Sequence, residues 1–140
     1  MALTEPHDGS PAPSLSISID RCKTELPGKL IEVGWLLQNR GSEPLELEES
    51  WLPHGQFRGE RQAFEPPISL GPQGTLMHTR KVDVGAATGS VVENAFLILR
   101  VRWRGKPWRI FARIRAGVTQ NRSIEPIVEL VTVSSVQPTA

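Results

Sequence analysis

The strongest constraint on the fold is an alternation of apolar and polar residues with period two between positions 95 and 116. Two consecutive runs place apolar side chains at every second position: Ala95, Leu97, Leu99, Val101 and Trp103, then Trp108, Ile110, Ala112 and Ile114. Successive side chains of a β-strand point to opposite faces, whereas a helix would need a spacing near 3.6. Gly105-Lys106 between the runs suits a two-residue type II′ turn, which needs glycine first. The segment therefore predicts a β-hairpin with one buried face.

The same alternation recurs along the rest of the chain, between turn signals such as Pro27-Gly28 and Asn39-Arg40-Gly41-Ser42. It predicts further strands at residues 15–19, 31–37, 45–51, 76–84 and 127–133. Residues 54–74 carry Pro66-Pro67 and Gly71-Pro72, and we expect loops with short edge segments there, because proline cannot donate to a central ladder. Residues 85–90 are expected to form a flexible loop. The chain thus predicts seven to eight short strands with almost no helical periodicity.

Strands of this number and spacing predict an all-β fold, an antiparallel sandwich of two sheets, with a small closed barrel as the alternative. The strand order and the Asn39-Arg40-Gly41 turn resemble the immunoglobulin-like and fibronectin-III-like superfamily over residues 14–134. The resemblance implies an immunoglobulin-like sandwich of about seven to eight strands. It departs from antibody domains because the chain has one cysteine and no tyrosine, so neither the paired cysteines nor a tyrosine corner is present. A shared fold implies no particular function.

The 140 residues suffice for one domain with a proper core. We expect residues 1–13, which include three prolines, to be a disordered leader, residues 14–136 to be a single β-sandwich domain, and residues 137–140 to be a frayed tail. No secretory signal opens the sequence, and no apolar run approaches the roughly 18 residues of a membrane helix. Cys22 has no partner for an internal disulfide. These features predict a cytoplasmic protein without membrane insertion.

One feature goes beyond a generic β-sandwich, namely the polar face of the predicted hairpin. A turn at Gly105-Lys106 would place Arg102 opposite Arg109, and no acidic residue occurs from Asn94 to Ile124. The arginines on this face are mixed with Phe96, Ile98 and Phe111. The candidate binding residues are therefore Arg100, Arg102, Arg104, Arg109, Phe111, Arg113 and Arg115.

Two interpretations of these arginines stay open. Glutamates of neighbouring strands, namely Glu32, Glu46 and Glu48, could neutralise them within the molecule as modest surface ion pairs. Alternatively, the planar guanidinium groups bind something acidic outside the chain. We rank an acidic protein surface or a second copy of the chain above nucleic acid, because the net charge is only +1 and no nucleic-acid-binding module is recognisable.

Residues capable of catalysis or metal binding show no productive pattern. The histidines, His7, His54 and His78, share no ligand spacing with one another or with Cys22, and no nucleophile or phosphate-binding motif occurs. Cys22 is expected to be a buried or half-buried residue at a strand end, and Trp51 is interpreted as a cap on the core rather than as a ligand contact. The sequence therefore predicts a non-enzymatic protein-interaction module without cofactor or metal, which uses the hairpin face or a free sheet edge. Nucleic-acid binding and an enzyme with an unrecognised site are the alternatives.

Overall fold

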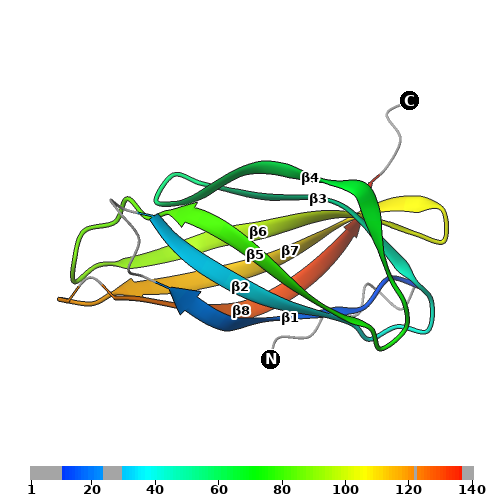
Figure 1. The fold of residues 1–140 in the computed structure, drawn as a ribbon, viewed down its shortest axis with the longest axis horizontal. Coiled ribbons are helices and arrows are strands. Elements are labelled where there is room, and N and C mark those ends of the chain that lie inside the picture. The colour runs from blue at the N-terminus through cyan, green and yellow to red at the C-terminus, as the bar shows by residue number, and fades with distance from the viewer. Residues whose placement is uncertain (1–10, 24–29, 122, 137–140) are drawn as a thin grey trace.

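The structure is a computed structural model that describes residues 11–23, 30–121 and 123–136 (Figure 1). Eight strands make up most of these residues: β1 (Leu15–Lys23), β2 (Leu30–Asn39), β3 (Leu45–His54), β4 (Phe57–Leu70), β5 (Thr75–Asp83), β6 (Val91–Trp103), β7 (Lys106–Val118) and β8 (Ile124–Ser135). Within the described ranges, no helix has the length and apolar character needed to cross a membrane.

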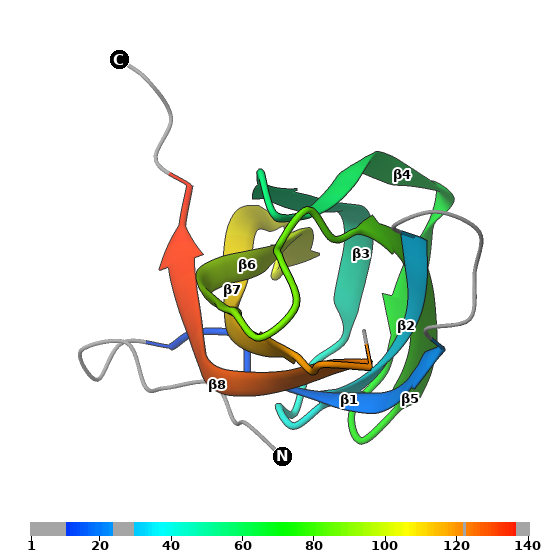
Figure 2. The ribbon, with the colours of Figure 1, turned by 90° about the vertical axis from the view of Figure 1, so that its left-hand side faces the viewer.

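The strands form one antiparallel sheet with the order β1-β2-β5-β4-β3-β6-β7-β8. Its two outer strands, β1 and β8, lie side by side, so the sheet curls into a nearly closed barrel (Figure 2). The predicted two-sheet immunoglobulin-like sandwich is therefore wrong. The reason lies in β3, which pairs with β4 along one edge and with β6 along the other, and so joins both halves of the chain into one ladder.

The barrel interior is filled by the apolar side chains that the alternation placed on one face. Ile31, Val33, Trp35 and Leu37 of β2 are buried, and so is every second residue from Ala95 to Trp103 of β6. At the turn end of the hairpin, the rings of Trp103 and Trp108 meet edge to face with centroids 6.0 Å apart. The predicted inward faces of β2 and β6 are therefore confirmed, and burial of each large apolar side chain there stabilises the fold by about 1.5–3 kcal/mol.

A β-bulge in β3 changes which side chains face the interior. Leu47 pairs with Val101 and Glu49 pairs with Arg100, so Glu48 is an extra residue without a partner in the β6 ladder. The extra residue shifts the alternation of the rest of the strand by one position. Ser50 is therefore buried, whereas Trp51 lies half-exposed on the outer face. The prediction that Trp51 caps the core is wrong for this reason.

Residues 54–74 are more regular than expected. Residues 57–70 form the long strand β4, whose ladder with β3 is interrupted between Ala63 and Ile68, where Pro66 and Pro67 lie. On its other side, β4 pairs with β5 at one position only, Arg58 opposite Asp83. Residues 59–70 of β4 and 75–82 of β5 are therefore neighbours without backbone pairing, and we call this boundary the β4–β5 seam.

The hairpin turn also differs from its prediction. Arg104 and Gly105, with φ of 50° and 71°, occupy the turn, and Trp103 pairs with Lys106. Positive φ at both central positions is typical of the type I′ turn, whose twist matches that of the flanking strands. Arg109 therefore lies opposite Arg100 and not Arg102. The partners shift by two residues, so each side chain keeps its predicted face.

Some predictions concern residues outside the described ranges. These are residues 1–10 of the leader with His7, the turn at Pro27-Gly28, and the tail at 137–140. Within the described part of the leader, Ala12 packs against the core. The loop predicted at 85–90 is confirmed as a segment without strand structure between β5 and β6.

Candidate functional site

The structure brings all seven predicted binding residues together on the outer side of β6 and β7. Most of them are exposed, while Phe111 and Arg113 are half-buried. Phe111 meets Phe96 edge to face, with ring centroids 6.3 Å apart. We call this surface the arginine face: Arg100, Arg102, Arg104, Arg109, Phe111, Arg113 and Arg115.

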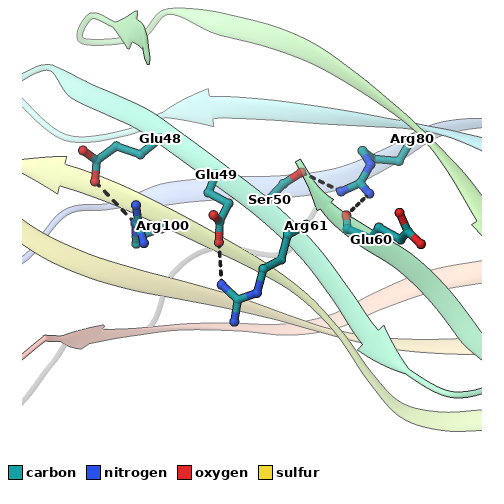
Figure 3. Close-up of polar contacts among 7 residues, drawn as sticks. All are labelled: Glu48, Glu49, Ser50, Glu60, Arg61, Arg80 and Arg100. Atoms are coloured by element: carbon teal, nitrogen blue, oxygen red, sulfur yellow. Dashed lines mark hydrogen bonds and ion pairs between the residues drawn. The ribbon is translucent and has the colours of Figure 1, made fainter. Parts of the chain in front are cut away.

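Acidic side chains of the same chain lie against much of the arginine face. Glu48 lies 3.8 Å from Arg100 Nε and 3.6 Å from Arg102 Nε, and Figure 3 shows its contact with Arg100. Further pairs join Arg104 to Glu43, Arg113 to Glu129 at 3.6 Å, and Arg115 to Glu93 at 3.5 Å. These arginine side chains remain 41–50% exposed. Long ion pairs between exposed groups contribute little to stability, so the arginines stay available to a ligand.

The three glutamates expected to neutralise this face differ in their positions. Glu48 does so because the bulge turns it toward the arginines. Glu46 lies opposite Arg102 in the ladder and lines a surface hollow with Arg102 and Arg104. Glu32 lies between Lys23 and Lys81 in the β1-β2-β5 part of the sheet, so its expected role is wrong.

The centre of the arginine face has an excess of positive charge. Arg109 is exposed, lies directly opposite Arg100, and has no carboxylate partner among the described residues. Nearby, Arg61 Nη1 lies 2.7 Å from Glu49 Oε1 (Figure 3), and the Arg61 guanidinium lies 3.9 Å from the centroid of the Trp51 ring. A shallow hollow, here called the Arg109 hollow, is lined by Glu49, Trp51, Arg61, Ile98, Arg100, Arg109 and Phe111. Three arginines and one glutamate give this hollow a net charge of +2.

A second group of polar side chains lies inside the barrel. Ser50 Oγ accepts a hydrogen bond from Arg80 Nη1 at 2.7 Å, and Arg80 Nη2 donates to the carbonyl oxygen of Glu60 (Figure 3). Ser50 Oγ also lies 2.9 Å from His78 Nε2. The Phe64 ring covers His78, with centroids 4.9 Å apart. Ser50, His78 and Arg80 are all buried, and we call them the interior polar cluster.

Burial sets the protonation states in the interior polar cluster. Loss of solvent, and then the neighbouring Arg80 charge, lower the pKa of His78 to about 4. The ring is therefore neutral at pH 7, and its tautomer sets whether His78 Nε2 or Ser50 Oγ is the donor in their hydrogen bond. Burial also lowers the pKa of Arg80, but a guanidinium keeps its proton in proteins. The cluster thus holds one buried positive charge.

The sequence contained a signal for the interior polar cluster that its interpretation missed. His78 and Arg80 lie four and two residues before Val82, a buried residue of the same strand, so the alternation places both side chains inside the barrel. Ser50 could not be found in this way, because the bulge at Glu48 reverses its expected side.

The interior polar cluster does not form an accessible catalytic site. A serine hydroxyl close to a histidine nitrogen resembles an activated nucleophile. However, Ser50 is 0% exposed, so a substrate cannot reach its oxygen. The described residues also contain no group of three acidic, histidine or cysteine side chains placed to hold a metal ion.

Cys22 is a free, half-buried thiol near the end of β1, as predicted. Burial raises the pKa of this thiol, which lowers the fraction of reactive thiolate at neutral pH.

Comparison of the chain with protein-family models, with curated proteins and with solved structures found no match. Its function is therefore inferred from the charges, exposure and contacts of the described residues.

Proposed function

We propose that the protein is a non-enzymatic interaction module that binds an acidic, partly apolar segment of a protein partner across the arginine face. The observation that carries the proposal is the position of Arg109. It is exposed, it lies directly opposite Arg100, and the described residues supply no carboxylate to it.

The physical basis is relief of charge repulsion. Like charges directly opposite each other on a sheet destabilise it by roughly 0.2–1 kcal/mol. A carboxylate placed between Arg100 and Arg109 would replace this repulsion by two charge-assisted hydrogen bonds, which are stronger than neutral ones. The free energy gained therefore favours occupancy by an anionic group.

The surroundings of Arg109 favour a peptide over a nucleic acid. Four glutamates form ion pairs with arginines of this face, namely Glu43, Glu48, Glu93 and Glu129. Their charges would repel a continuous phosphate backbone, whereas a peptide presents separate carboxylates that can avoid them. The Arg109 hollow also has apolar walls from Trp51, Ile98 and Phe111, which suit an aromatic or aliphatic side chain.

Fluorescence anisotropy with labelled peptides tests the proposal. One probe carries six glutamates, a second carries a phenylalanine at the centre of the same sequence, and a third probe is single-stranded RNA. We expect the phenylalanine-containing peptide to bind most tightly and every affinity to fall as salt rises. Arg109→Gln should weaken peptide binding several-fold, because the unpaired cation is lost.

Lys81→Gln is the matched control, since Lys81 is an exposed cation on β5, away from the arginine face. It should leave peptide binding unchanged. RNA binding tighter than peptide binding, or equal losses in both variants, would overturn the proposal. So would a dimer in sedimentation that Arg109→Gln dissociates, because a second copy would then occupy the surface.

A further inference from the structure

Arg80 is a buried cation without an anionic partner. Only 6% of the residue is exposed, and its two hydrogen bonds go to a serine hydroxyl and a backbone carbonyl, neither of which carries a charge. No described carboxylate pairs with it. Taking an ion out of water is costly unless an opposite charge compensates. A counterion would therefore stabilise the buried Arg80 guanidinium, and the described residues do not supply one.

The position of Arg80 gives a ligand a route to it. The side chain reaches from Ser50 in the interior to the backbone of Glu60, so it crosses the β4–β5 seam (Figure 3). Between β4 and β5, Arg58 and Asp83 are the only residues that pair through the backbone. The Nε atom of Arg80 has no hydrogen-bond partner among the described residues and is not one of their fully buried, unpaired nitrogens. It therefore keeps contact with solvent.

We propose that Arg80 binds a small oxyanion, of the phosphate or carboxylate type, at the β4–β5 seam. The planar guanidinium suits such a ligand because its N–H groups match the spacing of two oxygen atoms. Ser50 and the Glu60 carbonyl each take one N–H of a terminal nitrogen, which leaves the Nε–H and one further N–H on each terminal nitrogen for the anion. This proposal is independent of the arginine face.

Neighbouring groups make the seam suitable for an anion. His78 is neutral and bound to Ser50, so it fixes the orientation of the hydroxyl that holds Arg80. No acidic side chain among the described residues pairs with the interior polar cluster, although Glu60, whose carbonyl accepts from Arg80, carries an exposed carboxylate on β4. Trp35 lies opposite His78 in the β2–β5 ladder, and its buried indole N–H has no partner among the described residues. An unpaired donor therefore also exists on the adjacent strand.

Calorimetric titration with inorganic phosphate at pH 7, with ionic strength held constant by sodium chloride, tests the proposal. Sodium acetate replaces phosphate in a second series and shows which oxyanion type is preferred. We expect saturable binding to the wild type and a rise of several degrees in its melting temperature. Arg80→Lys, which keeps the charge but loses the planar fork, should weaken the affinity at least tenfold.

Arg109→Gln separates this site from the arginine face, because it should leave phosphate binding unchanged. Loss of binding in Arg109→Gln with retention in Arg80→Lys would overturn the proposal. An unsaturable rise in melting temperature that is equal in both variants would also overturn it, since excluded salts stabilise any fold. If Arg80→Lys does not fold, NMR of the wild type decides: phosphate must shift the Arg80 Nε–H resonance, and an unmoved resonance rejects the site.

Discussion

Acid should weaken the fold through His78, because its ring is buried without charge in the interior polar cluster. The ring is 5% exposed, it bonds to Ser50 on β3, and it lies beside the positive charge of Arg80. Protonation would place a second positive charge in this interior. The imidazole of His78 therefore binds a proton more weakly in the folded protein than in the unfolded chain.

The magnitude follows from the pKa of His78 in the two states. The pKa is about 4 in the folded protein, against an ordinary value of 6.5. Below pH 6.5 the unfolded chain binds more protons than the folded one, so the free energy of unfolding falls as the pH falls. The loss begins near pH 6.5 and ends near pH 4. At about 1.4 kcal/mol for each pH unit, it amounts to roughly 3 kcal/mol, a large share of the roughly 5–15 kcal/mol typical of a domain.

Urea unfolding of the wild type and of His78→Gln between pH 7 and pH 4 measures this loss. Glutamine keeps an acceptor for the Ser50 hydroxyl but cannot titrate, and the carboxylates are common to both proteins. We expect the stability of the wild type to fall by roughly 3 kcal/mol more than that of the variant over this range. An NMR titration of the imidazole gives the folded pKa directly. Equal pH dependence in both proteins, or an imidazole that titrates near pH 6.5 in the folded state, would refute the reasoning.

Three further substitutions test local features of the barrel. Gly59→Ala places a methyl group 3.0 Å from a guanidinium nitrogen of Arg80, and urea unfolding should show a loss of about 1–3 kcal/mol. Gly55→Ala, whose methyl group would meet nothing within 4 Å, is its matched control. Gly105→Ala should lose about 1–2 kcal/mol in the same assay because φ is 71°, and Gly105→Asn should lose less. Deletion of Glu48 removes the extra residue of β3, so circular dichroism should still show a folded sheet. The acidic peptide should bind more tightly, because Glu48 no longer pairs with Arg100 and Arg102. An unfolded product would contradict the assignment of Glu48 as the extra residue of a bulge.

The sequence predicted the strands and their inward faces well, because alternation records which side of a strand is buried. It assigned the arginines of β6 and β7 to one outer face for the same reason. Their register was wrong by two residues, since Gly105 serves equally well as the first residue of one turn type or the second of another. A shift of two residues preserves every face. The arginine face was therefore found, although the opposition of Arg100 and Arg109 was not.

Closure of the sheet could not be predicted from alternation, because the pattern reports only one buried face for each strand. A sandwich and a barrel share that pattern and differ only in which strand edges pair. The deciding contact is the ladder of β3 with β6, two strands separated by more than 35 residues of chain. Pro66 and Pro67 added to the error. They interrupt the β3 ladder locally, as expected, yet strand structure extends on both sides of them.

The bulge at Glu48 connects the two proposed sites, which lie on opposite sides of β3. In a regular strand that continued from Leu47, Glu49 would point inward and Ser50 outward. The extra residue reverses this, so Glu48 and Glu49 both face the arginines while Ser50 reaches Arg80 and His78. A single inserted residue therefore sets the charge balance outside the barrel and supplies the hydroxyl that holds the buried cation inside it. In the sequence, Trp51 continues the odd-numbered alternation of Leu45 and Leu47 and so conceals the insertion, which is why Ser50 is placed in the interior polar cluster only by the three-dimensional structure.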